Sequence, residues 1–370
     1  MRIAFDSGAL YQGHAVRGIG VMVQEQIRAL EKEAKKRKGV RFKSMSFEGK
    51  DLSDYDVIHY PYFFPYSCTL PKEKKAKKIV VTIQDLIHMV YPKVYPPGIK
   101  GRINLLKQKK RLELTDAVIT ISETSKKDIV RFLGIDEKKV HVVYLAPKPI
   151  FKTLAKEKLI KTKKKYKLPE RFVLYVGDIN YNKNLPSLIK ACSTAKINLV
   201  IVGKQALDIE DLGIELPVIS GPKDWIRYVF NIPHPELVHY KELLREFSPN
   251  KNIIRTGFVT ESELVAIYNM ATVYCQPSYY EGFGLPVLEA MACGTAVIAS
   301  KTQALVEIAD GACVFVDPND PKDISRAILS VIKSPKLRDD LIKKGALKAR
   351  QYSWEKTGRG IMDVYEKVLY

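Results

Sequence analysis

Residues 277–299 read PSYYEGFGLPVLEAMACGTAVIA, and the interpretation of the whole chain starts from them. The order of residues predicts a turn, a glycine loop, a short helix from Pro286 to Gly294 and a buried strand from Thr295 to Ala299. A glycine loop before a helix directs backbone N–H groups and the positive end of the helix dipole toward one point. We therefore expect an anion, most naturally a phosphate, to bind at this loop.

Two glutamates frame the glycine loop: Glu281 precedes it, and Glu289 lies about one turn inside the helix. At about 1.5 Å of rise per helical residue, their backbones are separated by up to roughly 12 Å. An acid and a base that act on one glycosidic bond stand about 5–9.5 Å apart. The spacing therefore favours contact with the two ends of one long ligand, with its phosphates in the middle. Ordinary solvated acids at a helix N-terminus are the alternative.

Length and composition indicate a soluble globular chain of two domains, because 370 residues exceed one comfortable core. The sequence has no run of eighteen apolar residues, and its first residues read as a buried strand rather than a signal peptide. The cysteines are scattered without metal-ligand spacing, so we expect reduced thiols in the cytoplasm and no structural metal. They are Cys68, Cys192, Cys275, Cys293 and Cys313.

The formal net charge is +20, carried by lysine-rich patches at 32–43, 72–78, 100–111 and 161–167. One interpretation is a solvated, lysine-rich surface of the kind found in thermophilic proteins. The other is attraction to a polyanion, either an anionic membrane surface or nucleic acid. Aromatic residues do not interleave these patches as single-strand binding requires, so nucleic acid is disfavoured. A peripheral position at the inner membrane face is therefore one prediction.

Strand-like and helix-like segments alternate through the first 145 residues, which predicts a doubly wound α/β domain. Gly18 and Gly20 follow the first strand as in a dinucleotide fingerprint, but Val23 stands where its third glycine would be, which disfavours nicotinamide binding. Ligands gather at the carboxyl ends of parallel strands. The candidates there are His59, Gln84, Asp85 and His88.

A second alternating set begins at Phe172, after a lysine-rich segment at 151–168 that we interpret as the interdomain connection. The predicted domains are 1–165 and 166–352, followed by a terminal helix at 353–370 that packs back toward the first domain. Residues 205–252 predict two helical segments, around Trp225 and around Leu243, without an assigned function.

With these motifs placed, the sequence resembles the retaining glycosyltransferases of family 4 along nearly its whole length. The strongest match is residues 281–294, EGFGLPVLEAMACG, which are similar to the family's motif of two glutamates separated by seven residues. Weaker matches keep the family's order. They are RGIG at 17–20, TIQDLI at 82–87, YVG at 175–177, NKNL at 182–185 and Glu307 ahead of VDP at 316–318.

The resemblance implies a GT-B fold, in which two Rossmann-like domains face each other across a cleft. It implies hexosyl transfer from a nucleotide diphosphate sugar, with GDP-mannose favoured and a UDP-sugar possible, to a glycan or lipid-linked acceptor in cell-envelope synthesis. Glu281 and Lys183 would be catalytic, and Glu289 would hold the ribose. The other donor-side residues would be Gly282, Phe283, Gly284, Leu285, Gly177, Asn182 and Gly20, and the acceptor side would use Gly18, Gln84, Asp85 and His59.

We expect no metal and no other cofactor, because Lys183 and the helix end would take the place of a divalent cation at the leaving diphosphate. Retention would follow from same-face attack, and a covalent intermediate on Glu281 is the second possibility. Domain closure would exclude water from the reaction.

Two departures from the family pattern keep other functions open. Asp178 and Asn182 stand where the family often has an arginine, so Lys183, or Arg17 or Arg255, would carry that charge. Gln84 stands where a histidine is usual, and an amide hydrogen-bonds a hydroxyl but does not shuttle a proton. The alternatives are a catalytically weak nucleotide-sugar-binding relative and a GT-B sugar-nucleotide epimerase.

Overall fold

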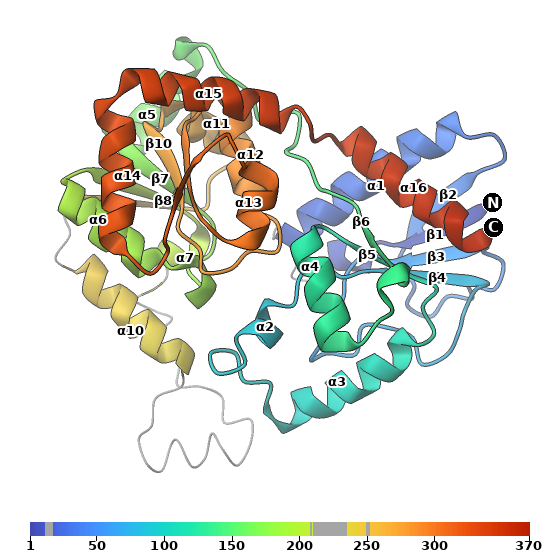
Figure 1. The fold of residues 1–370 in the computed structure, drawn as a ribbon. Coiled ribbons are helices and arrows are strands. Elements are labelled where there is room, and N and C mark those ends of the chain that lie inside the picture. Colours follow the sequence, from blue (N-terminus) through green and yellow to red (C-terminus); the bar gives the residue numbers. More distant parts are fainter. Residues whose placement is uncertain (12–17, 208, 210–234, 249–251) are drawn as a thin grey trace. The chain divides into compact units, whose positions relative to one another are not determined.

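A computed structural model describes residues 1–11, 18–207, 209, 235–248 and 252–370 (Figure 1). The chain forms two compact units. The first comprises Met1–Pro92, Pro96–Ala146 and Tyr352–Tyr370, and the second comprises Lys93–Tyr95 and Pro147–Gln351. The predicted helix around Trp225 and the candidate Arg17 lie outside the described residues.

The first unit is built on a six-stranded sheet in the order β2-β1-β3-β4-β5-β6, with every pairing parallel. Strands β3 and β5 are buried along their whole length, as expected for apolar runs covered by helices on both faces. The edge strand β2 was not predicted. The strands are β1 Arg2–Asp6, β2 Arg41–Met45, β3 Val57–Tyr60, β4 Lys78–Thr82, β5 Ala117–Thr120 and β6 Val140–Val142.

Helices cover the two faces of this sheet. On one face α16 (Trp354–Leu369) lies alongside α1 (Gly18–Lys36), so closely that a Cβ at Gly358 would be 2.9 Å from the Ala29 carbonyl oxygen (Figure 1). On the other face Leu112 of α3 (Gly98–Leu112) joins a core with Ile58. The remaining short helices are η1 Gly8–Leu10, α2 Ile87–Val90, α4 Glu123–Asp128, η2 Ile129–Leu133 and η3 Glu137–Lys139.

The second unit contains another parallel six-stranded sheet, in the order β12-β11-β10-β7-β8-β9. This is the strand order of the dinucleotide-binding fold, which reverses direction between β7 and β10. Two doubly wound parallel sheets confirm the predicted α/β class. The strands are β7 Phe172–Val176, β8 Asn198–Val202, β9 Ile253–Gly257, β10 Val273–Gln276, β11 Val297–Ser300 and β12 Val314–Val316.

Successive side chains of β7 and β10 point to opposite faces of this sheet. Val173 and Tyr175 pack into a core with α6 and α14, whereas Tyr274 points toward Tyr268 of α11. The helices are η4 Lys156–Leu159, α5 Ile160–Tyr166, η5 Tyr181–Lys183, α6 Leu185–Ala195, α7 Lys204–Leu207, α10 Pro235–Phe247, α11 Glu261–Met270, α12 Leu285–Ala292, α13 Gln303–Ala309, α14 Pro321–Lys333 and α15 Pro335–Ala349.

The lysine-rich segment at 151–168 belongs to the second unit, which begins at Pro147 rather than at 166. Phe151 is buried edge-on against Tyr268 of α11, and Leu168 is buried as well. Lys165 forms an ion pair of 2.6 Å with Glu263 at the start of α11. Apolar residues spaced among the lysines therefore anchor this segment to the second unit.

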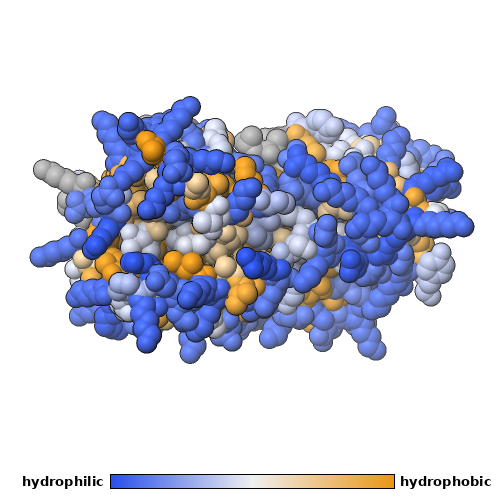
Figure 2. Space-filling view, turned by 90° about the horizontal axis from the view of Figure 1, so that it is seen from above, coloured by the Kyte–Doolittle hydropathy of each residue, from blue (hydrophilic) through white to orange (hydrophobic). Residues whose placement is uncertain are grey.

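The surface agrees with the high net charge. The face in Figure 2 is mostly hydrophilic, with hydrophobic residues in small separate groups. Within the described ranges, every helix is too short or too polar to cross a bilayer.

Replacing Gly284 is expected to destabilise the second unit. Gly284 has φ of 107°, and a Cβ there would be 2.5 Å from Leu305 Cδ2 and 3.0 Å from Ile308 Cδ1 of α13. Gly284→Ala should lower the free energy of unfolding by about 2–4 kcal/mol, as strain of about 1–3 kcal/mol adds to the clash. The matched control Gly311→Ala has φ of 75° but open space around it, and should lose only about 1–2 kcal/mol. Denaturant unfolding checks both, and equal losses would contradict the packing argument.

Candidate active site

Two loops meet at the carboxyl ends of β7 and β10. One is the loop from Gly177 to Asn184 after β7, and the other is the loop at 277–284 after β10. Asn184 Nδ2 donates to the carbonyl oxygens of Pro277 at 2.9 Å and Pro318 at 2.7 Å. Asn182 accepts the Tyr279 N–H at its backbone oxygen, at 2.8 Å. Segments about a hundred residues apart in sequence are thus joined at the position where the strand order reverses, which is where open α/β sheets bind ligands.

The centre of this junction is an ion pair between Lys183 and Glu281. Lys183 Nζ lies 2.9 Å from both carboxylate oxygens of Glu281. The Glu281 side chain is 7% exposed and the Lys183 side chain 22% exposed. Two residues predicted to be catalytic are therefore in direct contact, and a positive charge stands at the carboxyl edge of the sheet.

Neutral donors hold the Glu281 carboxylate in place. Gln276 Nε2 donates to Oε1 at 2.7 Å, and Ser278 Oγ donates to the same oxygen at 2.6 Å. The other amide atom of the Gln276 side chain, Oε1, accepts from the buried Tyr274 hydroxyl, which fixes the orientation of the amide. Sequence reasoning missed these three residues. A polar residue that ends a buried apolar strand, as Gln276 does, is the signal that would have found them.

Glu289 lies on α12 and is half-buried, with its Oε2 accepting the Tyr268 hydroxyl at 3.0 Å. Burial raises the pKa of the Glu289 carboxyl from its ordinary 4.5 to about 7, and nearby Glu261 raises it further. The Tyr268 hydrogen bond and the charge of Lys148 act in the opposite direction. The Glu289 carboxyl is therefore poised to lose its proton near neutral pH.

The glycine loop leads into α12 as the sequence predicts. Phe283 is buried, Gly284 is the N-cap residue, and Leu285 opens the helix half-buried. No side chain caps this helix N-terminus, and Pro286 in its first turn has no N–H. Gly282, the residue after Glu281, is buried. Anion binding by this loop stays a prediction.

Two glycines allow the loops after β7 and β8 to pack backbone against backbone. A Cβ at Gly203 would lie 2.3 Å from the carbonyl oxygen of Gly177, which itself has φ of 146°. Gly177 thus allows the close packing of backbone at the carboxyl edge of the sheet, where Lys183 lies.

Two other donor-side candidates make structural contacts. Asn182 is buried, and its side chain donates to the Tyr280 carbonyl oxygen at 3.1 Å and accepts the Tyr95 hydroxyl at 3.2 Å. Arg255 donates to the Ala206 carbonyl oxygen at 3.1 Å and lies over the Phe247 ring. Lys183 is accordingly the cation that these loops place at the switch point of the sheet.

In the first unit, part of the predicted acceptor side comes together. Gly18 is exposed at the start of α1 and Gly20, two residues further into the helix, is buried. Gln84 Nε2 donates to the Pro61 carbonyl oxygen at 2.9 Å and lies 3.8 Å from Met22 Sδ of α1. Asp85 Oδ1 accepts the Ile87 N–H at 3.2 Å, which stabilises the turn into α2.

His59 does not belong with this group. Its side chain is fully buried, with Nδ1 2.5 Å from the Tyr365 hydroxyl and Nε2 2.7 Å from Thr82 Oγ1. Burial lowers the pKa of His59 to about 3, so the ring is neutral. Successive side chains of β3 point to opposite faces of the sheet, and that of His59 points to the face covered by α16. The prediction that His59 lines the ligand site was therefore wrong.

Sequence reasoning also passed over Asp6, at the carboxyl end of β1. The strand order of the first sheet reverses between β1 and β3, and Asp6 stands at that position. Its Oδ1 accepts the N–H groups of Gly8 at 3.0 Å and Phe47 at 3.2 Å, while burial raises the pKa of the carboxyl. The Asp6 charge adds to burial in raising the pKa of Tyr60 and Tyr62.

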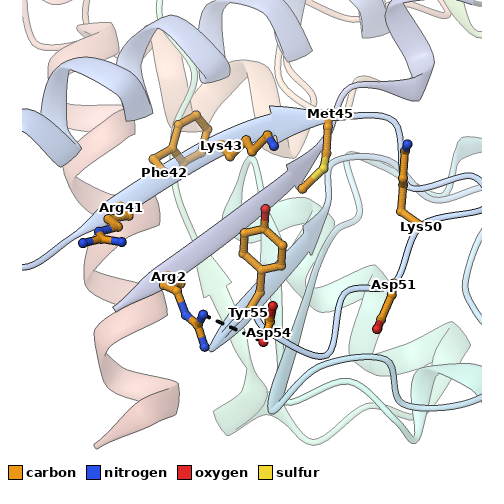
Figure 3. A pocket seen from close by; sticks show the side chains of 9 residues that line it. All are labelled: Arg2, Arg41, Phe42, Lys43, Met45, Lys50, Asp51, Asp54 and Tyr55. Atoms are coloured by element: carbon orange, nitrogen blue, oxygen red, sulfur yellow. Dashed lines mark ion pairs between the residues drawn. The ribbon is translucent and has the colours of Figure 1, made fainter.

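A separate pocket of about 590 Å³ opens beside β1 and β2 (Figure 3). Asp54 lines this pocket and belongs to the sequence Asp54-Tyr55-Asp56. Asp-x-Asp is a metal-binding type of sequence, and the prediction of a metal-free site overlooked this one. Asp54 lies 3.9 Å from Arg2 Nη1, and Asp56 pairs with Lys77 at 2.7 Å. This triplet precedes β3, at the amino end of the sheet and away from the switch point. Among the described residues, His, Cys, Asp and Glu side chains form no group of three suited to a metal ion.

Comparisons with known proteins agree with this geometry. The model of the family "Glycosyl transferases group 1" matches residues 156–348, and that of "Glycosyltransferase Family 4" matches residues 16–146. The O-antigen chain mannosyltransferase B of Escherichia coli is 26% identical over 326 residues, which are 86% of this chain and 75% of the relative. The serotype-specific mannosyltransferase WbdA of Escherichia coli is 24% identical over 85% of this chain, which spans 37% of the relative's length.

Among solved structures, Anabaena HepE in complex with UDP-glucose superposes with a TM-score of 0.66 at 14% identity. The match covers 99% of this chain and 100% of that one. It shows a shared fold.

Glu289 is expected to make stability depend on pH. Between about pH 4.5 and pH 7 the folded chain holds a proton on Glu289 that the unfolded chain has released, so stability falls as pH rises through this window. Glu289→Gln cannot ionise there. Its free energy of unfolding relative to the parent should therefore increase by about 1–3 kcal/mol from pH 4.5 to pH 8.

Denaturant unfolding at the two pH values measures this difference. Glu31→Gln, at an exposed position of α1, is the control and should show no such change. If the stability of Glu289→Gln relative to the parent stays constant with pH, Glu289 does not hold a proton in the folded chain between pH 4.5 and pH 7.

Proposed function

The chain belongs to the group 1 glycosyl transferases and has the GT-B fold, and we propose that it moves a hexose from a nucleotide diphosphate sugar to an acceptor hydroxyl with retention of configuration. Two relatives named as mannosyltransferases support a mannosyl donor, and we favour GDP-mannose. The UDP-glucose in the HepE structure supports a nucleotide sugar as the donor class and keeps a UDP-sugar as the second choice.

The observation that carries the proposal is the Lys183–Glu281 pair at the carboxyl ends of β7 and β10. When the donor breaks down, negative charge grows on the oxygen that leaves with the diphosphate. A cation held in advance near that oxygen stabilises the transition state more than the ground state. The contact with Glu281 holds the Lys183 ammonium group in place, so little reorganisation is needed to present its charge.

The two glutamates would then bind different parts of the donor. Glu281 accepts from Lys183, Gln276 and Ser278, which fixes its orientation for accepting hydroxyls of the transferred sugar. Glu289, about a turn into α12, would accept from the ribose hydroxyls in its ionised form. Because the Glu289 pKa is raised to about 7, donor binding should strengthen as pH rises through neutrality.

In the proposed step the bond between the anomeric carbon and the leaving phosphate oxygen breaks. The acceptor oxygen forms its bond on the same face, and its proton passes to that phosphate oxygen. The donors on Glu281 support a role in holding the sugar, because each lowers the nucleophilicity of the carboxylate. Lys183 and the N-terminus of α12 would supply the positive charge, so we propose that no metal is needed.

The acceptor would be a glycan or a lipid-linked glycan in cell-envelope synthesis. Gln84, Asp85 and the start of α1 at Gly18 and Gly20 remain the proposed acceptor-side groups, and His59 is excluded from them by its burial. Gln84 bonds a carbonyl through its amide nitrogen, which leaves its carbonyl oxygen oriented to accept a sugar hydroxyl.

Turnover of a panel of nucleotide sugars tests the function. We expect release of GDP from GDP-mannose to rise when acceptor glycan is present, and NMR coupling constants to show retention in the product. Conversion of the donor sugar without any acceptor would indicate an epimerase instead. Binding of nucleotide, seen as thermal stabilisation by GDP, UDP or ADP, with no release across the panel would indicate an inactive relative.

Substitutions at the ion pair should separate the roles of its members. Lys183→Ala is expected to lower kcat by about 10²–10³, the size of effect seen when one donor to a developing oxyanion is removed. Glu281→Gln should mainly lower kcat, and Glu289→Gln should mainly raise KM. Lys165→Ala removes an ion pair elsewhere on the same unit and should leave both constants within twofold. Full activity of Lys183→Ala would refute the assignment.

A further inference from the structure

Helix α3 (Gly98–Leu112) is held to the first unit by one side only. Asn104 Nδ2 donates to the Tyr66 carbonyl oxygen at 3.0 Å, and Gln108 Nε2 donates to the Phe64 carbonyl oxygen at 3.0 Å. A Cβ at Gly101 would be 3.4 Å from Tyr66 Cβ. These residues recur every three or four positions and define the packed face of the helix.

The opposite side of α3 carries three large apolar side chains in contact with solvent. Ile99 is 60% exposed, Ile103 48% and Leu106 69%. At about 100° per residue they fall within roughly 60° of one another, on the side of the helix away from Gln108. Single exposed apolar residues are ordinary, but a stripe of three on one helix is a surface feature that needs a partner.

Positive charge surrounds this apolar stripe. The helix contains six basic residues and no acidic one, and it lies at the margin of its unit, away from α1 and α16 (Figure 1). Arg102 and Lys109 flank the stripe on one side, Lys100 and Lys107 flank it on the other, and Lys110 continues its line. Arg111 turns back to donate to the Leu70 carbonyl oxygen at 2.7 Å.

This combination matches the chemistry of an anionic lipid surface. An interfacial helix buries an apolar side in the acyl boundary while its basic residues lie at the level of lipid phosphates. At 15 residues α3 is roughly 22 Å long, so it would lie along the surface. A nucleic acid would use the charges but leave the isoleucines and the leucine without contacts.

We propose that α3 is a membrane-docking helix, which binds anionic bilayers by inserting Ile99, Ile103 and Leu106 between headgroups that its lysines and arginines neutralise. The inference rests on the proposed function for its purpose, since docking would bring the enzyme to a lipid-linked acceptor. Docking itself requires no turnover.

Flotation of the full chain with vesicles tests the proposal. We expect binding to vesicles of phosphatidylcholine with 30% phosphatidylglycerol at low salt, and little binding to pure phosphatidylcholine. Removing two charges, in Lys107→Gln with Lys110→Gln, should weaken the partition coefficient about 25-fold, at about fivefold per charge. Removing the apolar side chains, in Ile103→Ser with Leu106→Ser, should weaken it at least tenfold.

The helix α15 offers matched controls. Leu347 is 62% exposed there, and Leu347→Ser, like the charge-matched pair Lys336→Gln with Lys343→Gln, should bind vesicles within twofold of the parent. Circular dichroism checks that every variant is folded. Unchanged vesicle binding by the Ile103/Leu106 variant would overturn the proposal. So would binding of a DNA or RNA duplex that is tighter than vesicle binding and insensitive to that variant.

The two proposals fail separately. Release of nucleotide from a soluble donor measures the reaction, and the α3 variants should retain it in solution because no donor-side residue lies on α3. An enzyme that turns over donor but does not bind vesicles would refute docking alone. A chain that binds vesicles but does not turn over any donor would refute the proposed function alone.

Discussion

The second unit depends on one interaction, the contact of Lys183 with Glu281 at the switch point of its sheet. Burying a carboxylate is costly unless donors compensate for lost water, and here a cation, an amide and a hydroxyl do so. Of these bonds, the one from Lys183 also joins the loop after β7 to the loop after β10. The arrangement that satisfies Glu281 is therefore also the arrangement that holds a positive charge at the carboxyl edge of the sheet.

In both sheets polar groups lie at the carboxyl ends of the strands where the strand order reverses, but the groups differ. In the second unit, strand reversal between β7 and β10 brings together a cation and an acid from distant parts of the chain. In the first unit, reversal between β1 and β3 places the buried Asp6 near Tyr60 and Tyr62. The parallel topology of the two sheets therefore gathers a cation and an acid at one switch point, and a buried acid near two tyrosines at the other.

The sequence predicted the fold because buried parallel strands are continuous apolar runs, as at 79–81 and 172–176. It failed for β2, whose edge position allows the charged sequence RFKSM, and for the domain boundary, where lysines obscured the buried Phe151 and Leu168. Glu281 and Lys183 were identified as site residues from motifs. Their direct contact spans 98 residues and depends on register, which local patterns do not carry. His59 was assigned to the wrong place because the sequence around a histidine near a strand end does not show whether its side chain faces solvent or a covering helix.

The central claim is that the charge at the β7–β10 junction is the place where a nucleotide diphosphate binds. A crystal structure of the chain with GDP measures this most directly. We expect the β-phosphate within hydrogen-bond distance of Lys183 Nζ, beside the glycine loop at 282–284, with the ribose hydroxyls on Glu289. A diphosphate bound elsewhere, with the Lys183–Glu281 contact away from the ligand, would contradict it.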